Sequence, residues 1–317
     1  MKVLVTGGSG FVGRALLRHL VALDRYEVSA TTRVNPADPV SGVRYTVVGD
    51  MTSQKRWQSE LAGVQVLVHA AARVHALNDR TAGSLERFEQ VNVEVTLELA
   101  RQAAAAGVRR FVFLSSIGVN GVMTEVNTAF SETDQAQPHN AYADSKLKAE
   151  QGLRKLADET GLEVVIIRPP LVYGPGVRAN FAALMRAVQR GWPLPLGAVH
   201  NLRSMVAVDN LVDFIITCMT HPGAANQTFL VSDGRDLSTA DLIRGLAREM
   251  GVPARLIPVP PCVLWKLADL LRRSYVIQRV CGSLRVDITK AKTLLGWVPR
   301  ISVDEGLRRA VASIRKS

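Results

Sequence analysis

VLVTGGSGFVG, residues 3–13, is the stretch that most strongly indicates the fold. An aliphatic run ends in a glycine-rich turn, in which Gly7, Gly10 and Gly13 follow the spacing G-x-x-G-x-x-G. The first glycine permits a tight turn, the second lets the backbone approach a pyrophosphate, and the third lets helix and strand pack closely. The helix N-terminus then points its free amide groups at the phosphates. This stretch predicts a dinucleotide site; a tight turn without a ligand is the alternative.

Short apolar runs alternate with helical patterns through the first half of the chain. We expect strands at 2–6, 27–32, 44–48, 65–70, 110–115 and 163–168, and helices near 11–23, 53–62, 84–106 and 142–160. This alternation predicts an α/β fold with a Rossmann-type doubly wound parallel sheet.

Prolines and glycines interrupt this pattern in IRPPLVYGPG, residues 167–176. We therefore expect an NAD(P)-binding domain over 1–172 and a smaller, mixed α/β substrate-binding lobe mainly over 173–317. The segment 205–232 is expected to return to the first domain.

The bulk composition is that of an ordinary globular protein of 317 residues, 47% hydrophobic, with a formal net charge of +11. Lys and Arg are scattered and no nucleic-acid-binding motif is found, so we expect no nucleic-acid partner. Cys218, Cys262 and Cys281 lack paired spacing, which predicts neither disulfides nor a metal site. Met1 leads directly into a strand, which predicts a cytoplasmic protein without an integral membrane segment.

The densest basic region, LRRSYVIQRV at 271–280, follows the amphipathic stretch CVLWKLADLL at 262–271. We expect that stretch to pack onto the protein, with contact to a membrane surface as the alternative.

The stretch VSATTRVN, residues 28–35, lacks the acid that usually binds the adenosine ribose about 20 residues after the glycine turn. Thr31, Thr32 and Arg33 stand there instead. The guanidinium of Arg33 matches phosphate oxygens, so we expect NADP (NADPH) to be preferred, with NAD possible; alternatively, Arg33 is a solvated surface residue. Asp50 is placed to meet the adenine amino group or to begin a turn.

YADSK places Tyr142 and Lys146 one turn apart on one helix face. An adjacent ammonium favours a phenolate, so we expect the pKa of Tyr142 to fall and the phenol to exchange a proton with substrate. Ser116 can hydrogen-bond the same substrate oxygen. An ordinary helical contact is the alternative reading of this spacing.

The chain resembles the extended short-chain dehydrogenases/reductases of the nucleotide-sugar epimerase, dehydratase and reductase group, through TGGSGFVG, HAAA, SSIGVNG, YADSK, RPPLVYGPG, RSMVAVDNLV and DITKAKTLLGW. The resemblance implies a UDP-sugar substrate, homodimerisation through the helices at 84–106 and 142–160, and Ser116, Tyr142 and Lys146 as catalytic residues. The expected cofactor contacts are Gly7, Gly10, Phe11, Val12, Gly13, Thr32, Arg33, Asp50, Met51, Ala70, Ala71, Ala72, Asn92, Ser115, Tyr142, Lys146 and Pro169. The expected substrate contacts are Ser116, Tyr142, Asn180, Leu196, Arg203 and Arg279.

Three reactions share this scaffold. A 4,6-dehydratase needs an acid and a base beside the serine, where this chain has Ser116, Ile117 and Gly118. Because none of these side chains is a carboxyl group, we do not expect dehydration. Because Arg33 favours NADPH, we expect reduction of a 4-keto sugar. The stretches RPPLVYGPGVRANF and LVSDGRDLST are similar to reductases of bacterial surface-polysaccharide synthesis. This resemblance implies a UDP-2-acetamido-2,6-dideoxy-4-keto-hexose as the substrate. The alternatives are a UDP-glucose or UDP-N-acetylglucosamine 4-epimerase and a non-catalytic cofactor sensor.

Overall fold

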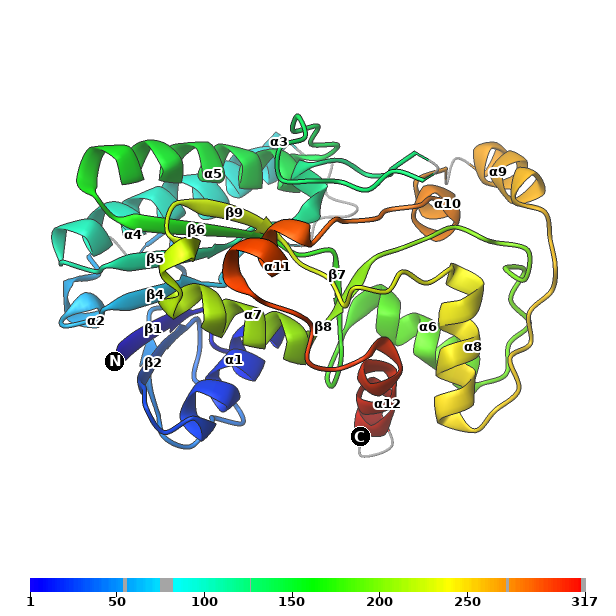
Figure 1. The fold of residues 1–317 in the computed structure, drawn as a ribbon, viewed down its shortest axis with the longest axis horizontal. Coiled ribbons are helices and arrows are strands. Elements are labelled where there is room, and N and C mark those ends of the chain that lie inside the picture. Colours follow the sequence, from blue (N-terminus) through cyan, green and yellow to red (C-terminus); the bar gives the residue numbers. More distant parts are fainter. Residues whose placement is uncertain (54–55, 75–81, 126, 272–273, 315–317) are drawn as a thin grey trace.

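A seven-stranded parallel sheet forms the centre of the computed structural model, which describes residues 1–53, 56–74, 82–125, 127–271 and 274–314 (Figure 1). In spatial order the strands are β3 (Val43–Val47), β2 (Glu27–Thr32), β1 (Lys2–Thr6), β4 (Val66–His69), β5 (Arg110–Leu114), β6 (Glu163–Arg168) and β9 (Gln227–Leu230). The order reverses between β1 and β4, which confirms the Rossmann-type prediction and opens a crevice at the strands' carboxyl ends.

Alternate side chains of the strands enter two different cores. Val3 and Val5 pack in the core formed with α1 (Phe11–Ala22) and α7 (Val208–Thr220). Leu4 packs on the opposite face with α4 (Val95–Ala105) and α5 (Ala141–Thr160). Helices therefore cover both faces of the sheet, as Figure 1 shows.

Two helix predictions have different outcomes. The expected helix at 84–106 is present as α3 (Ala82–Phe88), a π-helical segment (Glu89–Glu94) and α4. The expected helix at 53–62 is wrong in extent, since α2 covers only Gln58–Leu61 and residues 54–55 lie outside the described residues. The backbone nitrogen of the fully buried Trp57 donates to the side-chain oxygen of Gln102 at 2.7 Å, which fixes the chain outside helical geometry before α2.

A second group of elements lies beyond the sheet. Strands β7 (Leu171–Tyr173) and β8 (Met205–Ala207) pair in parallel beside α6 (Ala179–Gln189), α8 (Thr239–Met250) and α12 (Val303–Ile314), which share a third core. Between α8 and α12 the chain forms three further helices, α9 (Pro261–Leu270), α10 (Ser274–Cys281) and α11 (Thr289–Leu295). Strand β9 lies within 205–232, the segment expected to return to the first domain, and it pairs with β6 in the large sheet. The domain boundaries themselves stay a prediction. Within the described ranges, no helix has the length and apolar character needed to cross a membrane.

Candidate active site

The glycine turn after β1 has the geometry that close approach of a phosphate requires. Gly7 has φ +74°, and a β-carbon there would lie 2.7 Å from the backbone nitrogen of Ala71. A β-carbon on Gly13 would collide with the Gly7 carbonyl. Gly10 caps α1 without a side-chain hydrogen bond, and the first turn carries no acidic residue. The N-terminus of α1 is therefore suited to bind an anion.

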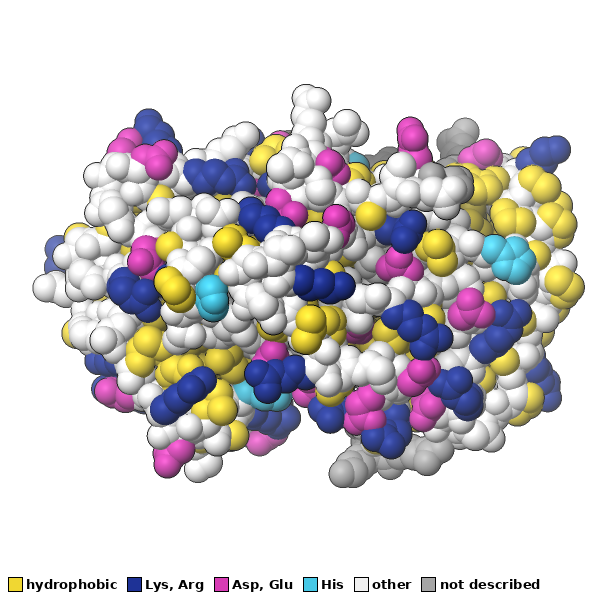
Figure 2. Space-filling model, in the orientation of Figure 1, with side chains coloured by type: hydrophobic (Ala, Val, Ile, Leu, Met, Phe, Trp, Pro, Cys, Tyr) yellow, Lys and Arg dark blue, Asp and Glu magenta, His cyan; other side chains and the backbone are white. Residues whose placement is uncertain are grey.

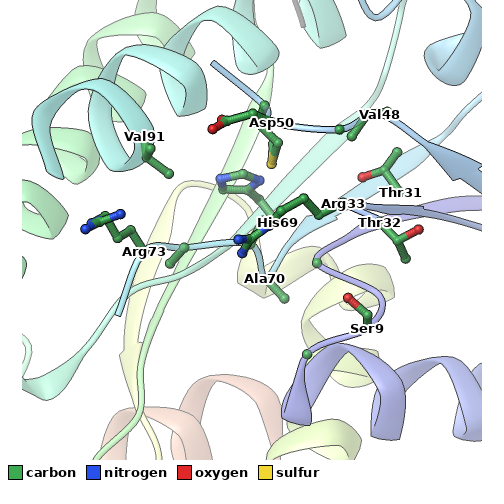
Figure 3. Close-up of a pocket in the computed structure, with 16 residues that line it drawn as sticks. Ser9, Thr31, Thr32, Arg33, Val48, Asp50, His69, Ala70, Arg73 and Val91 are labelled. Carbon is green, nitrogen blue, oxygen red and sulfur yellow. The ribbon is translucent and has the colours of Figure 1, made fainter. Parts of the chain in front are cut away.

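A cavity of about 260 Å³ lies at the carboxyl ends of β1 to β4 (Figure 3). Nine of the residues predicted to contact the cofactor line it: Gly7, Gly10, Thr32, Arg33, Asp50, Met51, Ala70, Ala71 and Ala72. Sequence reasoning did not assign seven other lining residues: Ser9, Thr31, Val48, Gly49, His69, Arg73 and Val91. All of these except Val91 lie at or shortly after the carboxyl end of a strand, so topology could have found most of them.

Two buried hydroxyl groups indicate that this cavity fits a polar ligand. The side chains of Thr31 and Thr32 are 1% and 2% exposed, and Oγ1 of each has no hydrogen-bond partner among the described residues. A buried hydroxyl without a partner costs about 1–3 kcal/mol. Both residues line the cavity, so a ribose or phosphate could supply the missing partners.

Asp50 lies between two arginines at the mouth of the cavity. Its Oδ1 accepts hydrogen bonds from the backbone nitrogen and the hydroxyl of Thr52, at 3.0 and 2.9 Å. These bonds lower the pKa of Asp50, and the positive charges of Arg33 and Arg73 lower it further. Arg33 is exposed and extends over the cavity in Figure 3. Its charge is therefore partly balanced by this carboxylate.

The remaining predicted cofactor residues do not line the cavity: Phe11, Val12, Gly13, Asn92, Ser115, Tyr142, Lys146 and Pro169. Asn92, 1% exposed in the π-helical segment, pairs with the backbone of Arg73, accepting at 2.9 Å and donating at 3.2 Å. It also donates to the hydroxyl of Ser145 at 3.0 Å. Asn92 therefore holds the chain after β4 beside α5.

Tyr142 and Lys146 lie in the first two turns of α5, which Asn140 caps by accepting from the amide of Ala143 at 2.8 Å. Lys146 is 2% exposed, and its Nζ donates to the carbonyl oxygen of Leu114 at 2.7 Å. The same nitrogen lies 4.4 Å from the centre of the Phe113 ring. The ammonium is thus held at the carboxyl end of β5, one turn from the phenol.

The expected fall in the pKa of Tyr142 is wrong for the chain on its own. Burial raises the pKa of Tyr142 to about 12, and burial lowers the pKa of Lys146 to about 7. Desolvation penalises the charged form of both groups and outweighs their proximity. The buried carboxylate of Glu150 acts in the opposite direction on the pKa of Lys146 by favouring the ammonium.

Ser116 precedes a 3₁₀ turn, Ile117–Val119, at the end of β5. Its Oγ accepts a hydrogen bond from the amide of Gly118 at 3.1 Å. A β-carbon on Gly118 would lie 3.4 Å from both Ser116 Oγ and Ala143 Cβ, and 3.6 Å from His139 Cε1. The structure therefore brings Ser116 close to the start of α5, where Tyr142 lies.

Ser115 enters a buried polar network. It donates to Glu150, which is fully buried and also accepts two bonds from Arg168, at 2.9 and 2.6 Å. Arg168 donates a further bond to Asn120 at 2.9 Å. Pro169 accepts from the amide of Ile117 at 3.0 Å. These contacts fix the loop that carries Ser116 to α5 and β6.

His69, which the sequence did not single out, ends β4 at the floor of the cavity. Nδ1 lies 2.7 Å from the hydroxyl of Thr6, and Nε2 lies 3.0 Å from that of Thr96. The ring stacks on Phe113 with a centroid distance of 5.9 Å. Burial lowers its pKa to about 3, so His69 is neutral at physiological pH.

The charge of Arg279 acts on two other basic side chains, those of Arg203 and His139. Nη1 of Arg203 donates to the Gly282 carbonyl at 2.9 Å, and its pKa is lowered by burial and by the charge of Arg279. Burial and Arg279 also lower the pKa of His139. No salt bridge to an acid is formed by either arginine within the described part of the chain. The group is therefore a candidate site for an anion, and it includes His139, which the sequence did not suggest.

The other two predicted substrate residues are Asn180 and Leu196. Asn180 is exposed in the first turn of α6, and Leu196 packs against the third core. Their roles stay predictions.

The fold and the cavity define a dinucleotide-binding α/β protein of the Rossmann type. The profile of the NAD dependent epimerase/dehydratase family matches residues 3–232, and the chain belongs to this family. It is 44% identical over 311 residues to the UDP-glucose 4-epimerase of Vibrio cholerae, a match that covers 97% of this chain and 94% of that protein. It is 27% identical to the N-acetyl-alpha-D-glucosaminyl-diphospho-ditrans,octacis-undecaprenol 4-epimerase of Escherichia coli O157:H7, covering 98% and 94%.

Solved structures agree in fold. The UDP-glucose 4-epimerase of Thermotoga maritima with UDP-glucose has a TM-score of 0.81 at 24% identity, covering 100% of this chain and 99% of that chain. MoeE5 in complex with UDP-glucose and NAD has a TM-score of 0.79 at 25% identity and the same coverage. The two sequence relatives named above are both 4-epimerases, which favours the alternative hypothesis over the ketoreductase.

Proposed function

We propose that this protein is a UDP-hexose 4-epimerase that inverts C4 of UDP-glucose or UDP-N-acetylglucosamine with NAD. The observation that carries the proposal is the 44% identity to the Vibrio cholerae UDP-glucose 4-epimerase over 97% of the chain. The placement of Ser116, Tyr142 and Lys146 around the start of α5 is consistent with this chemistry. The proposal reverses the order of our sequence-based hypotheses, in which the ketoreductase came first.

NAD, when bound, supplies the acceptor and donor of the C4 hydride. Tyr142 takes the proton of the C4 hydroxyl and returns it after the sugar has presented its other face. Ser116 donates a hydrogen bond to the same oxygen and orients it. Because the pKa of Tyr142 is about 12 in the chain alone, the reaction needs positive charge beside the phenol. Lys146 in its protonated form and a nicotinamide cation both supply such charge.

Arg203, Arg279 and His139 would hold the diphosphate of the substrate. The charge of Arg279 already lowers the pKa of Arg203, and an anion bound between the two guanidinium groups would relieve this repulsion. Asn180 and Leu196 would complete the substrate contacts, a proposal that rests on the resemblance alone. The resemblance also carries the proposed homodimer through the helices at 84–106 and 142–160. The proposed cytoplasmic location rests on the sequence.

A second candidate, an NADPH-dependent 4-ketoreductase, is favoured by one observation: Arg33 lies exposed at the cavity mouth where an acid would repel a 2′-phosphate. Against it, Asp50 already faces Arg33. Arg33→Asp should lower the ratio of NADPH to NADH use at least ten-fold if the candidate is right. An unchanged ratio would remove it.

The experiment that tests the epimerase is product analysis by nuclear magnetic resonance after incubation with UDP-glucose or UDP-N-acetylglucosamine and catalytic NAD. We expect the C4 epimer to form, and Tyr142→Phe to slow turnover by about 10³-fold. Tyr26→Phe should leave turnover unchanged, because Tyr26 precedes β2 at the end of the strand opposite the cavity. Absence of product with both sugars, together with NADPH oxidation dependent on a 4-keto sugar, would contradict the proposal.

A further inference from the structure

Exposed hydrophobic side chains concentrate on one short part of the chain. Of the 18 exposed large hydrophobic residues among those described, seven lie between 257 and 276. We call them the α9–α10 patch: Ile257, Val263, Leu267, Leu270, Leu271, Tyr275 and Val276. Figure 2 shows hydrophobic side chains gathered at the end of the molecule where Figure 1 places α9. Scattered exposed hydrophobic residues are ordinary, but a concentration of this kind marks an interaction surface.

Helix α9 is apolar on two faces. Leu264 and Ala268 are 7% and 5% exposed and form its inner face. Val263, Leu267 and Leu270 follow the spacing of a second face and are 49%, 52% and 80% exposed. A surface helix normally carries polar residues on its outer face. The exposed hydrophobic side chains on the outer face of α9 therefore favour contact with an apolar environment.

The positive charge of the chain favours an anionic partner for this patch. The chain has a formal net charge of +11, which attracts it to anionic surfaces. Lys266 is exposed in the middle of α9, where Asp269 is the single acid, and Arg279 is exposed in α10. Aliphatic side chains that enter the acyl boundary, beside cations that meet the headgroups, are typical of interfacial helices.

We propose that the α9–α10 patch binds the surface of an anionic lipid bilayer. Val263, Leu267 and Leu270 enter the headgroup and acyl boundary, while Lys266 remains at the level of the headgroups. Because α10 also carries Arg279, binding would place the anion site of the proposed function beside the membrane. The lipid contact itself rests on the patch and not on the reaction.

The test is flotation of the full chain with vesicles of phosphatidylcholine alone or with about 30% phosphatidylglycerol. We expect the protein to float with the anionic vesicles, and less so as salt is raised. The double substitution Leu267→Glu with Leu270→Glu should lower the bound fraction at least ten-fold. Val298→Glu, which changes a residue 59% exposed outside the patch, should leave binding unchanged.

Circular dichroism and UDP-sugar turnover show whether both variants are folded, and both should match the parent protein. Lipid binding is measured separately from turnover, so failure of the membrane proposal can be told from failure of the proposed function. Three results would overturn the proposal: no binding to anionic vesicles, equal binding by the double variant, or a dimer in solution that the double variant abolishes without any lipid binding. The last result would assign the patch to a second copy of the chain.

Discussion

The side-chain nitrogen of Lys146 donates a 2.7 Å hydrogen bond to the carbonyl oxygen of Leu114, which ties helix α5 to the end of β5. Leu114 directly precedes Ser115 and Ser116, so one bond fixes the positions of the lysine and of the serine loop. The cation also lies over the Phe113 ring, which stacks on His69 as well.

Lys146→Met should lower kcat for epimerisation by about 10²-fold or more, because it removes both the positive charge beside Tyr142 and the bond to Leu114. Lys148→Met provides the control, since Lys148 is exposed on the same helix and pairs with Glu89 at 2.9 Å. Steady-state turnover of both variants measures the difference. Equal activities would show that the buried lysine has no catalytic role.

Gly7→Ala should abolish dinucleotide binding, because a β-carbon there would lie 2.7 Å from the Ala71 nitrogen. Gly161→Ala is a matched control: Gly161 has φ +73°, close to the +74° of Gly7, but nothing lies within 4 Å of its β-carbon. Each substitution forces alanine into left-handed backbone at about 1 kcal/mol or more. Isothermal titration with NAD should detect binding only to the Gly161→Ala protein; binding to both would mean that the glycine turn does not hold the cofactor.

His69 predicts a pH dependence of stability. Its pKa is about 3 in the folded chain, against 6.5 for an unperturbed histidine, so the unfolded chain binds the extra proton between these values. Stability that His69 contributes is therefore present above pH 6.5 and lost as the pH falls towards 3. From about pH 7.5 to about pH 5.5 the loss is about 1.4 kcal/mol.

Urea unfolding of the parent and of His69→Gln at these two pH values measures this contribution as a difference of differences. The variant should lose less stability on acidification, by about the same 1.4 kcal/mol. Identical pH profiles would mean that the imidazole accepts a proton in the folded state.

Arg203→Ala should raise the KM for UDP-sugars at least ten-fold while kcat falls less, because it removes the proposed contact to the diphosphate, which would be made equally in ground and transition states. Arg190→Ala, a change in an arginine that lies over Trp192, is the control. Initial rates over a range of UDP-glucose concentrations separate the two parameters. A fall in kcat alone would place Arg203 outside substrate binding.

Residue spacing in the sequence predicted those parts of the candidate site that come from one continuous segment of the chain. The glycine turn and the pair of Tyr142 and Lys146 each follow from spacing within a single strand, turn or helix. Parallel strands gather their carboxyl ends at one edge, so the cavity was also foreseeable in position.

Contacts between distant segments were not predictable in the same way. Trp57 was expected in a helix, but its bond to Gln102 crosses 45 residues and prevents this. The pKa of Tyr142 depends on burial in the assembled fold, which spacing along one helix does not report. The group of His139, Arg203 and Arg279 forms only when three separate segments meet.

An epimerase of this kind must return the hydride taken from C4 to the same sugar. Incubation of UDP-glucose deuterated at C4 with the protein and NAD, followed by mass spectrometry of the products, measures where that hydride goes. We predict UDP-galactose that retains the deuterium, with no accumulation of free deuterated NADH. Transfer of the deuterium to free cofactor, or the absence of UDP-galactose and of the corresponding product from UDP-N-acetylglucosamine, would contradict the proposed function.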